Sequence, residues 1–248
     1  MNRWLGALIL AGACVAGSAP AWACKGQKVL FSDDFQQVDA SWGLDAPDVV
    51  VEDGKVKVKP QPNISNLLVY KGLVFNDSDL CVTVRMPNVV NNNDNTMAGP
   101  IFWQKDYDNY YMFMITPSGF AELARKHEGK WISVIDWRPD QNIKQQPGSN
   151  NVLRVVTKGN TITAFINDNR FAAVKGQMPD GGGRIGMRAQ SEQNQVDTWK
   201  FSALKVTDLA TDDPTLAPAP SGEAATPAAS ATPATQAAPA TPLPDAAK

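Results

Sequence analysis

The most constraining feature of this sequence is a long succession of short segments in which apolar and polar residues alternate. The alternation is plain at Lys55–Lys59 and at Thr161–Ile166, and it is the pattern of a strand with one buried face. Asp53-Gly54 and Gly159-Asn160 separate neighbouring segments, and such dipeptides are strong signals of two-residue hairpin turns. No segment shows the periodicity of a long amphipathic helix, so we predict an all-β chain.

The predicted strands follow one another at a spacing of about 8–12 residues, which is typical of sandwiches and barrels. They are Lys28–Phe31, Val49–Glu52, Lys55–Lys59, Leu67–Leu73, Asp79–Met86, Ala98–Gln104, Asn109–Thr116, Phe120–Arg125, Lys130–Asp136, Val152–Lys158, Thr161–Asn167, Arg170–Val174, Gly183–Ala189 and Thr198–Thr207. Short antiparallel strands of this kind bury their apolar faces by packing two sheets together. We therefore predict a two-sheet antiparallel β-sandwich of the jelly-roll type.

The N-terminal residues 1–23 have the features of a cleaved signal peptide. Arg3 provides a basic start, Leu5–Val15 an apolar centre, and Ala21-Trp22-Ala23 a cleavage site with small residues. The apolar stretch is shorter than a membrane span requires. A lipoprotein attached through Cys24 is the alternative, which Trp22 disfavours because a small residue is expected at that position. We expect a periplasmic or secreted protein.

The C-terminal residues 208–248 consist mostly of Ala, Pro, Thr and Ser. Such a segment buries too little apolar surface to offset its loss of conformational entropy, and we predict a disordered tail. Two roles remain open for it: an inert solubilising tail, or a spacer that reaches a cell wall, a membrane or a protein partner in the envelope. Residues 24–207 then form the jelly-roll domain.

The charge and the residue counts exclude several functional classes. The chain carries 23 basic and 25 acidic residues, for a formal net charge of -2, which argues against a nucleic-acid partner. A single histidine and three cysteines argue against multi-histidine metal catalysis and Cys-rich zinc sites.

The cysteines fit an exported protein. Cys14 lies within the predicted signal peptide, which leaves Cys24 and Cys81 in the mature chain. An even pair in an oxidising compartment predicts a disulfide; two free thiols are the alternative.

Several motifs occur together in a recognisable order. They are LFSDDF at Leu30–Phe35, Trp42, VEDGKVKVKP at Val51–Pro60, AGPIFWQKDYDNYYMFMI at Ala98–Ile115, EGKW at Glu128–Trp131, LRVVTKGNTITAFIND at Leu153–Asp168 and GGRIGMRA at Gly182–Ala189. The chain resembles the concanavalin A-like lectin/glucanase superfamily, near the bacterial laminin-G-like and 3-keto-disaccharide hydrolase-like domains. The resemblance implies a secreted jelly roll that handles carbohydrate, and its motifs specify the fold far better than the activity.

The densest group of polar and aromatic residues is Asp106–Tyr111. Rings beside carboxylates and an amide suit a saccharide site, which needs apolar faces and a few hydrogen-bonding groups. The alternative is an ordinary hairpin turn, and Tyr110 and Tyr111 must face opposite sides of their strand. Trp131 and Trp137 share a face of an unbroken strand, with Trp131 expected in the core. The predicted ligand-binding residues are Tyr107, Asp106, Asp108, Asn109, Tyr110 and Trp137.

A glycosidase needs two convergent carboxyl groups. The Glu-x-Asp-x-x-Glu motif of laminarinase-type members of the superfamily is absent, and Glu122 with Asp136 is the best remaining pair. The alternative is a solvated pair beside Arg125 and Lys126.

A structural calcium ion is a further hypothesis. Asp33 and Asp34 follow the first predicted strand and Asp197 precedes the last one, and carboxylate oxygens suit Ca²⁺. The alternative is that these acids only cap strand ends.

These observations favour an exported carbohydrate-binding module that uses an aromatic-lined sheet face and rim loops to contact a glycan or a cell-envelope polysaccharide. A glycoside hydrolase-like enzyme and a non-catalytic structural or interaction protein of the envelope are the alternatives.

Overall fold

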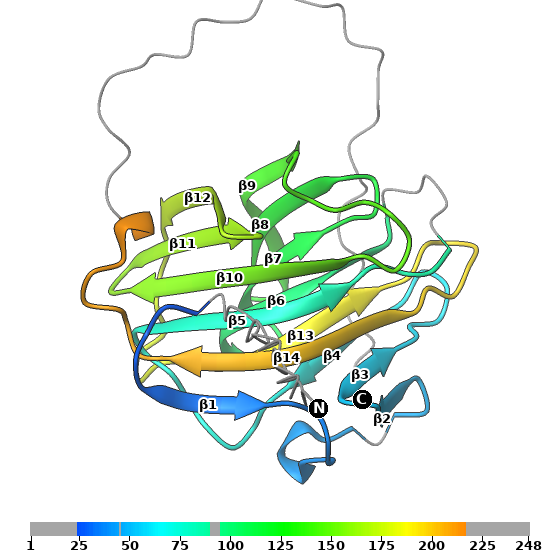
Figure 1. The fold of residues 1–248 in the computed structure, drawn as a ribbon, viewed down its shortest axis with the longest axis horizontal. Helices are drawn as coiled ribbons and strands as arrows, with labels where there is room; N and C mark the ends of the chain where they lie inside the picture. The colour runs from blue at the N-terminus through cyan, green and yellow to red at the C-terminus, as the bar shows by residue number, and fades with distance from the viewer. Residues whose placement is uncertain (1–23, 45, 90–94, 217–248) are drawn as a thin grey trace, which may run out of the picture.

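The computed structural model describes residues 24–44, 46–89 and 95–216, which form two antiparallel sheets packed face to face (Figure 1). The predicted signal peptide and most of the predicted tail lie outside the described residues. None of the described helices is long and apolar enough to cross a membrane.

The larger sheet has the strand order β12-β11-β10-β5-β14-β3-β2, and β1 also pairs with β14. Its strands are β1 (Val29–Asp33), β2 (Val49–Glu52), β3 (Lys55–Val58), β5 (Ser78–Arg85), β10 (Asn150–Lys158), β11 (Thr161–Ile166), β12 (Asn169–Lys175) and β14 (Trp199–Thr207). The six-stranded sheet has the order β4-β13-β6-β7-β8-β9. Its strands are β4 (Ser65–Val69), β6 (Met97–Asp106), β7 (Asn109–Ile115), β8 (Phe120–His127), β9 (Lys130–Pro139) and β13 (Arg184–Gln190).

Every predicted strand is confirmed, and so is the two-sheet sandwich. The turn between β2 and β3 illustrates why the local pattern sufficed. Asp53 and Gly54 both have positive φ, 52° and 66°, which is the geometry of the two-residue turn that Asp-Gly favours. The register opposes Val51 to Val56 and Glu52 to Lys55.

The core lies between the two sheets and contains one side chain in two from most strands. Its fully buried large members include Phe35, Phe113, Trp199, Phe201 and Leu80. Each such side chain contributes about 1.5–3 kcal/mol when it is removed from water. The indole N–H of Trp199 donates to Thr96 Oγ1 at 3.2 Å and to the Gln190 carbonyl at 3.3 Å, so this ring is buried without leaving its polar atom unsatisfied.

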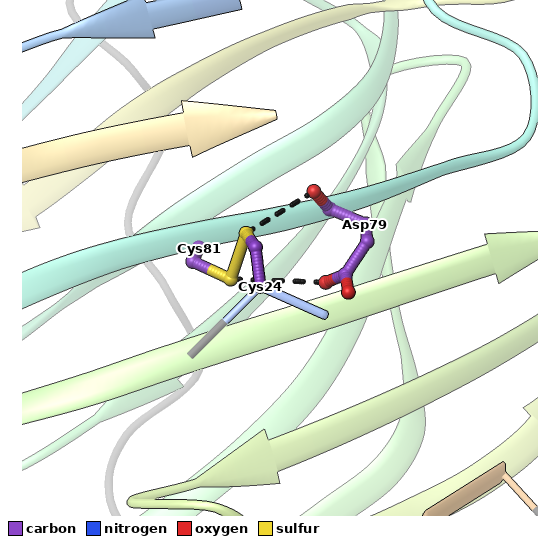
Figure 2. Close-up of side chains that lie close together, drawn as sticks. All are labelled: Cys24, Asp79 and Cys81. Atoms are coloured by element: carbon purple, nitrogen blue, oxygen red, sulfur yellow. Dashed lines mark hydrogen bonds between the residues drawn. A yellow bond between two sulfur atoms is a disulfide. The ribbon is translucent and has the colours of Figure 1, made fainter. Parts of the chain in front are cut away.

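The predicted disulfide is confirmed. Cys24 and Cys81 are joined with an S–S distance of 2.07 Å and a Cα–Cα distance of 5.6 Å. Figure 2 shows the bond beside Asp79. Leu80 and Val82 of β5 point into the core, so Cys81 lies on the outer face of the eight-stranded sheet, and the bond ties the start of the described chain to β5. A disulfide fits an extracellular or periplasmic protein, since reducing compartments keep cysteines in the free thiol form.

The chain continues past Thr207 with residues that contact the eight-stranded sheet. Residues 208–216 (orange in Figure 1) run along the end of the eight-stranded sheet and finish in a short helical turn, η2 (Pro214–Leu216). Asp213 forms an ion pair with Arg154 of β10, and Arg154 Nη1 donates to Thr215 Oγ1 at 3.1 Å. This ion pair and its hydrogen bonds hold residues 208–216 against β10, although the composition of this segment predicts no fixed structure.

Candidate functional site: the outer face of the six-stranded sheet

The outer face of the six-stranded sheet, which points away from the core, carries a second cluster of large side chains. Because side chains alternate along each strand, β7 directs Tyr111 and Phe113 into the core and Tyr110 and Met112 outward. The outward members are Val69, Met97, Ile101, Tyr110, Met112, Met114 and Ala124. Leu67, Trp131 and Trp137 are partly buried and pack against them. Two tryptophans therefore pack against a cluster of apolar side chains on this face.

Trp131 contacts one aromatic ring and two cations. The ring of Tyr110 meets it edge to face, with centroids 5.7 Å apart. Arg188 Cζ lies 5.0 Å and Lys126 Nζ 5.9 Å from the centroid of the Trp131 ring. Arg188 is fully buried and donates to Ser65 Oγ at 3.0 Å. Cations over a ring stabilise it electrostatically, so these contacts help to fix the orientation of Trp131.

Glu122 lies in the same face beside a bulge. Ala121 opposes Arg138 and Leu123 opposes Ile135, so the single residue Glu122 faces both Asp136 and Trp137 of β9. An extra residue in one strand redirects a side chain in this way. Glu122 Oε2 and Trp137 Nε1 are both buried and have no hydrogen-bond partner among the described residues. Buried polar atoms are normally paired, so these two atoms are exceptions that lie beside the two tryptophans.

The carboxyl group of Glu122 is electrostatically perturbed. Burial raises its pKa to about 7, and the charge of Asp136 adds to this increase. A hydrogen bond from Ser133 and the charge of Arg188 act in the opposite direction. A carboxyl group with a pKa near neutrality either donates or accepts a hydrogen bond at physiological pH.

The Glu122→Gln variant is expected to be more stable than the natural protein at pH 8, by up to about 3 kcal/mol. The folded pKa is raised, so ionising this buried group costs stability as the pH rises from about 4.5 through 7. The difference in the free energy of unfolding between the variant and the natural protein should shrink below pH 7 and vanish near pH 4. Urea unfolding at several pH values measures this difference.

Asp136→Asn is the comparison for the Glu122 variant. Its effect should have the same sign and be smaller, because Asp136 is exposed and its charge only adds to the effect of burial on the pKa of Glu122. A constant difference between Glu122→Gln and the natural protein from pH 4 to pH 8 would contradict the burial of the ionised group.

A groove of about 380 Å³ opens at one end of this face. Tyr107 and Asp108 of the β6–β7 turn and Lys126 of β8 line one side, and β4 and the segment around Leu44 line the other. Tyr107 is 50% exposed. Asp108 Oδ1 lies 3.4 Å from Lys126 Nζ, which ties the turn to the edge of the aromatic face. The groove thus combines an accessible ring, a carboxylate and an ammonium group.

No protein family and no curated protein sequence matches the chain. Several solved structures are similar to it in fold. The carbohydrate-binding module CBM66 from Bacillus subtilis is 10% identical over 62% of this chain and 86% of its own, with a TM-score of 0.50. LamAcat from Zobellia galactanivorans is 10% identical over 73% and 98%, with a TM-score of 0.52. The carbohydrate recognition domain of Emp47p is 16% identical over 66% and 87%, with a TM-score of 0.53.

The chain shares with these structures a sandwich of two antiparallel sheets. At such low identities the likeness concerns the fold alone, and it agrees with the superfamily that the sequence motifs predicted. The activity must be argued from this chain's own residues.

The Asp106–Tyr111 segment is a hairpin turn that also borders the groove. Asp106 accepts hydrogen bonds from the backbone N–H of Asp108 at 2.8 Å and from Asn109 Nδ2 at 2.9 Å. Asn109 Oδ1 accepts from the backbone N–H of Glu128 at 3.1 Å. These contacts occupy Asp106 and Asn109 within the turn, which leaves Tyr107 and Asp108 on the groove side.

The two tyrosines face opposite sides of β7, as predicted. Tyr110 is 1% exposed and supports Trp131. Tyr111 lies in the core, where its hydroxyl accepts from the Gln177 backbone N–H at 2.9 Å. The ligand-binding roles assigned to this segment and to Trp137 remain predictions.

Trp131 was expected in the core, and this prediction is wrong, because Trp131 packs on the outer face with Trp137. Sequence reasoning also missed Arg188 and Lys126. The alternation in GGRIGMRA contains the signal for Arg188, since Ile185, Met187 and Ala189 all lie in the core and place Arg188 on the opposite face.

The acids proposed for calcium are not brought together. β1 pairs with β14 as that hypothesis required, but Asp33 lies opposite Leu204, about 20 Å along the strand from Asp197. Each acid instead accepts a hydrogen bond from a nearby N–H group. Asp33 accepts from Trp42 Nε1 at 2.8 Å, and Asp34 accepts from the backbone N–H of Gln36 at 3.1 Å. Asp197 accepts from the backbone N–H of Glu192 at 3.0 Å. Among the described residues, the only group with metal-ligand spacing is Cys24, Asp79 and Cys81, whose sulfurs form the disulfide.

Proposed function

We propose that this protein is a carbohydrate-binding module whose site is the outer face of the six-stranded sheet, continued by the groove beside Tyr107. The observation that carries the proposal is the pair Trp131 and Trp137, beside two buried polar atoms that have no hydrogen-bond partner among the residues the structure describes, Glu122 Oε2 and Trp137 Nε1.

This combination matches the chemistry of a sugar. The C–H face of a pyranose packs on an indole ring, and its hydroxyl groups require donors and acceptors at fixed positions. Trp131 and Trp137 offer the rings, Glu122 accepts or donates, and the Trp137 indole donates. The edge of Tyr110 and the cations at Trp131 hold the site in shape before ligand arrives, which lowers the entropic cost of binding.

The fold supports the proposal without deciding it. CBM66 and the Emp47p domain are named as a carbohydrate-binding module and a carbohydrate recognition domain. The disulfide fits a module in the periplasm or outside the cell, and the predicted signal peptide supports the same location.

Trp137→Ala is expected to weaken binding of a glycan about tenfold to a hundredfold, because the variant loses both a stacking surface and a hydrogen-bond donor. A glycan array identifies the ligand, and calorimetry measures the dissociation constant. Trp137→Phe should recover part of the affinity, since it restores a ring without the donor.

Val29→Ala on the larger sheet is a control, since Val29 is exposed at 47% and belongs neither to the aromatic face nor to the lining of the groove. Unchanged binding by Trp137→Ala and Trp131→Ala, in folded protein, would remove this face from the proposal. A blank array would favour the structural or interaction role in the envelope, with the tail as its contact.

A glycoside hydrolase-like enzyme is a second candidate, favoured by the pKa of about 7 at Glu122 and by the nearby Asp136. In this hypothesis Glu122 donates a proton to the leaving oxygen and Asp136 is the second carboxyl group. Glu122→Gln should then abolish turnover of a bound glycan while binding persists. Binding without turnover in the natural protein would reject the enzyme and keep the module.

A further inference from the structure

The outer face of the eight-stranded sheet carries a row of cations at the end remote from the disulfide. Lys57 of β3 lies opposite Lys200 of β14, and Lys200 lies opposite Arg85 of β5. Their neighbours in sequence, such as Val56, Phe201 and Val84, are buried in the core, so all three cations point outward. Adjacent strands are about 4.8 Å apart, and three like charges therefore sit side by side. Lys59 follows Lys57 on the same face.

This row is poorly neutralised by the protein. Lys57 forms an ion pair with Glu52. Lys59, Lys200 and Arg85 form no ion pair with any described residue, and Arg85 Nε is buried without a hydrogen-bond partner. Burial and the charges of Lys57, Arg85 and Lys55 lower the pKa of Lys200, against a smaller opposing effect of Asp53. Like charges directly opposite each other destabilise a sheet, so an external anion would relieve a cost built into this face.

A cavity of about 450 Å³ adjoins the row, and its lining combines three kinds of group. Lys57, Lys59 and Lys200 supply the charge, and Asn88 and Gln195 supply amide groups. Val89 and Val196, which also line it, are exposed at 69% and 48%. Asp197 is the acid in the lining, and its oxygens are occupied by the Glu192 N–H and Gln195 Nε2, at 3.0 and 2.7 Å.

We propose that this cationic row and cavity bind an acidic polysaccharide, at a site separate from the aromatic face of the other sheet. The ammonium groups pair with the carboxylate or sulfate groups of the sugar units. The amide groups meet hydroxyls, and the exposed valines meet the apolar C–H faces, a combination that a simple inorganic anion would leave unused. The proposal does not depend on the proposed function, since it concerns a different sheet and different residues.

Binding of the full chain to polygalacturonate, dextran sulfate and neutral dextran tests the site. We expect binding of at least one acidic polymer and none of dextran, with affinity falling as salt is raised from about 20 to about 300 mM. The two acidic polymers distinguish carboxylate from sulfate recognition. Lys200→Gln should weaken binding about tenfold, and Lys59→Gln, at an exposed strand end, gives a second variant that perturbs the sheet little.

Lys158→Gln is the matched control, because Lys158 is exposed at the far end of β10 and the substitution removes the same charge. Lys200→Gln should also melt no lower than the natural protein, since it removes a repelled charge. The proposal is overturned if neither acidic polymer binds, if Lys200→Gln and Lys158→Gln bind equally, or if duplex DNA binds as tightly and displaces the polysaccharide. Loss of acidic-polymer binding in Trp137→Ala alone would assign the ligand to the other face.

Discussion

Arg154→Ala is expected to lower the free energy of unfolding by about 3–5 kcal/mol, because it breaks a buried ion pair by removing one partner. Arg154 is 2% exposed, and its Nε donates to both oxygens of Asp79, at 2.9 and 3.1 Å. Asp79 is 1% exposed. Without the guanidinium group, this carboxylate stays in the interior with its charge uncompensated.

The loss should depend on pH, with a sign that follows from the pKa of Asp79. Burial raises that pKa, and the hydrogen bonds and charge of Arg154 oppose the increase. In the variant the opposition is gone, so the folded-state pKa rises further above its unfolded value. A raised carboxyl pKa costs stability as the pH rises above the unfolded value of about 4. The deficit of Arg154→Ala should therefore be larger at pH 7 than at pH 4.

Asp213 reinforces this dependence. Burial tends to raise its pKa, but hydrogen bonds from Arg154 and Thr215 outweigh burial and lower it. Its pairing therefore stabilises the natural protein at neutral pH and is lost on acidification. The natural protein should lose stability in acid partly because residues 208–216 detach from β10.

Lys25→Ala is the control for Arg154→Ala, because the ion pair between Lys25 Nζ and Asp168 is partly exposed, with a distance of 3.3 Å. An exposed pair contributes about 0–1 kcal/mol. Urea unfolding of both variants measures the difference. Equal and small losses would show that water reaches Asp79 in the native state.

Local rules explain why the strands could be predicted and the ion-pair network could not. The alternation of apolar and polar residues at Lys55–Lys59 predicts a strand, and the Asp53-Gly54 pair predicts a hairpin turn. Arg154 and Asp213 are 59 residues apart, and no short-range pattern relates them. The segment around Asp213 is polar and rich in small residues, so its packing is visible only once β10 is in place.

The arrangement of the candidate site could also be predicted only in part from the sequence. The sequence predicted that Trp131 and Trp137 share a face, but it could not say which side of the sheet that face was. Two register shifts between β8 and β9 set the outcome, and such bulges place Asp136 and Trp137 together opposite Glu122. Bulges depend on how two strands pair, and for that reason the sequence of one strand does not reveal them.

Replacing Cys24 and Cys81 together with serine is expected to lower the free energy of unfolding by about 4 kcal/mol. The two cysteines are 57 residues apart, and a cross-link over a loop of this length removes that much conformational freedom from the unfolded chain in the loop-entropy description. Denaturation with and without a reducing agent gives the same comparison in the natural protein. The double variant should not respond to the reducing agent, and an unresponsive natural protein would contradict the prediction.

The disulfide and Arg154 should not act independently, because Asp79 lies between them. The Lys25 backbone N–H, next to Cys24, donates to Asp79 Oδ2 at 2.8 Å, and Cys24 Sγ contacts the Asp79 carbonyl oxygen at 3.3 Å. Without the disulfide, this N-terminal segment is freer to leave Asp79, and water then solvates part of the carboxylate. Arg154→Ala should therefore cost less in the disulfide-free chain.

A double-mutant cycle measures this coupling, which we expect to be about 0.5–3 kcal/mol for residues in one network. The combined loss should be smaller than the sum of the separate losses by that amount. Strict additivity would mean that the disulfide acts only on the unfolded chain and that Arg154 alone compensates Asp79. Sub-additivity would mean that both ends of the domain, residues 24–25 and 208–216, are held by one buried charge on the outer face of β5.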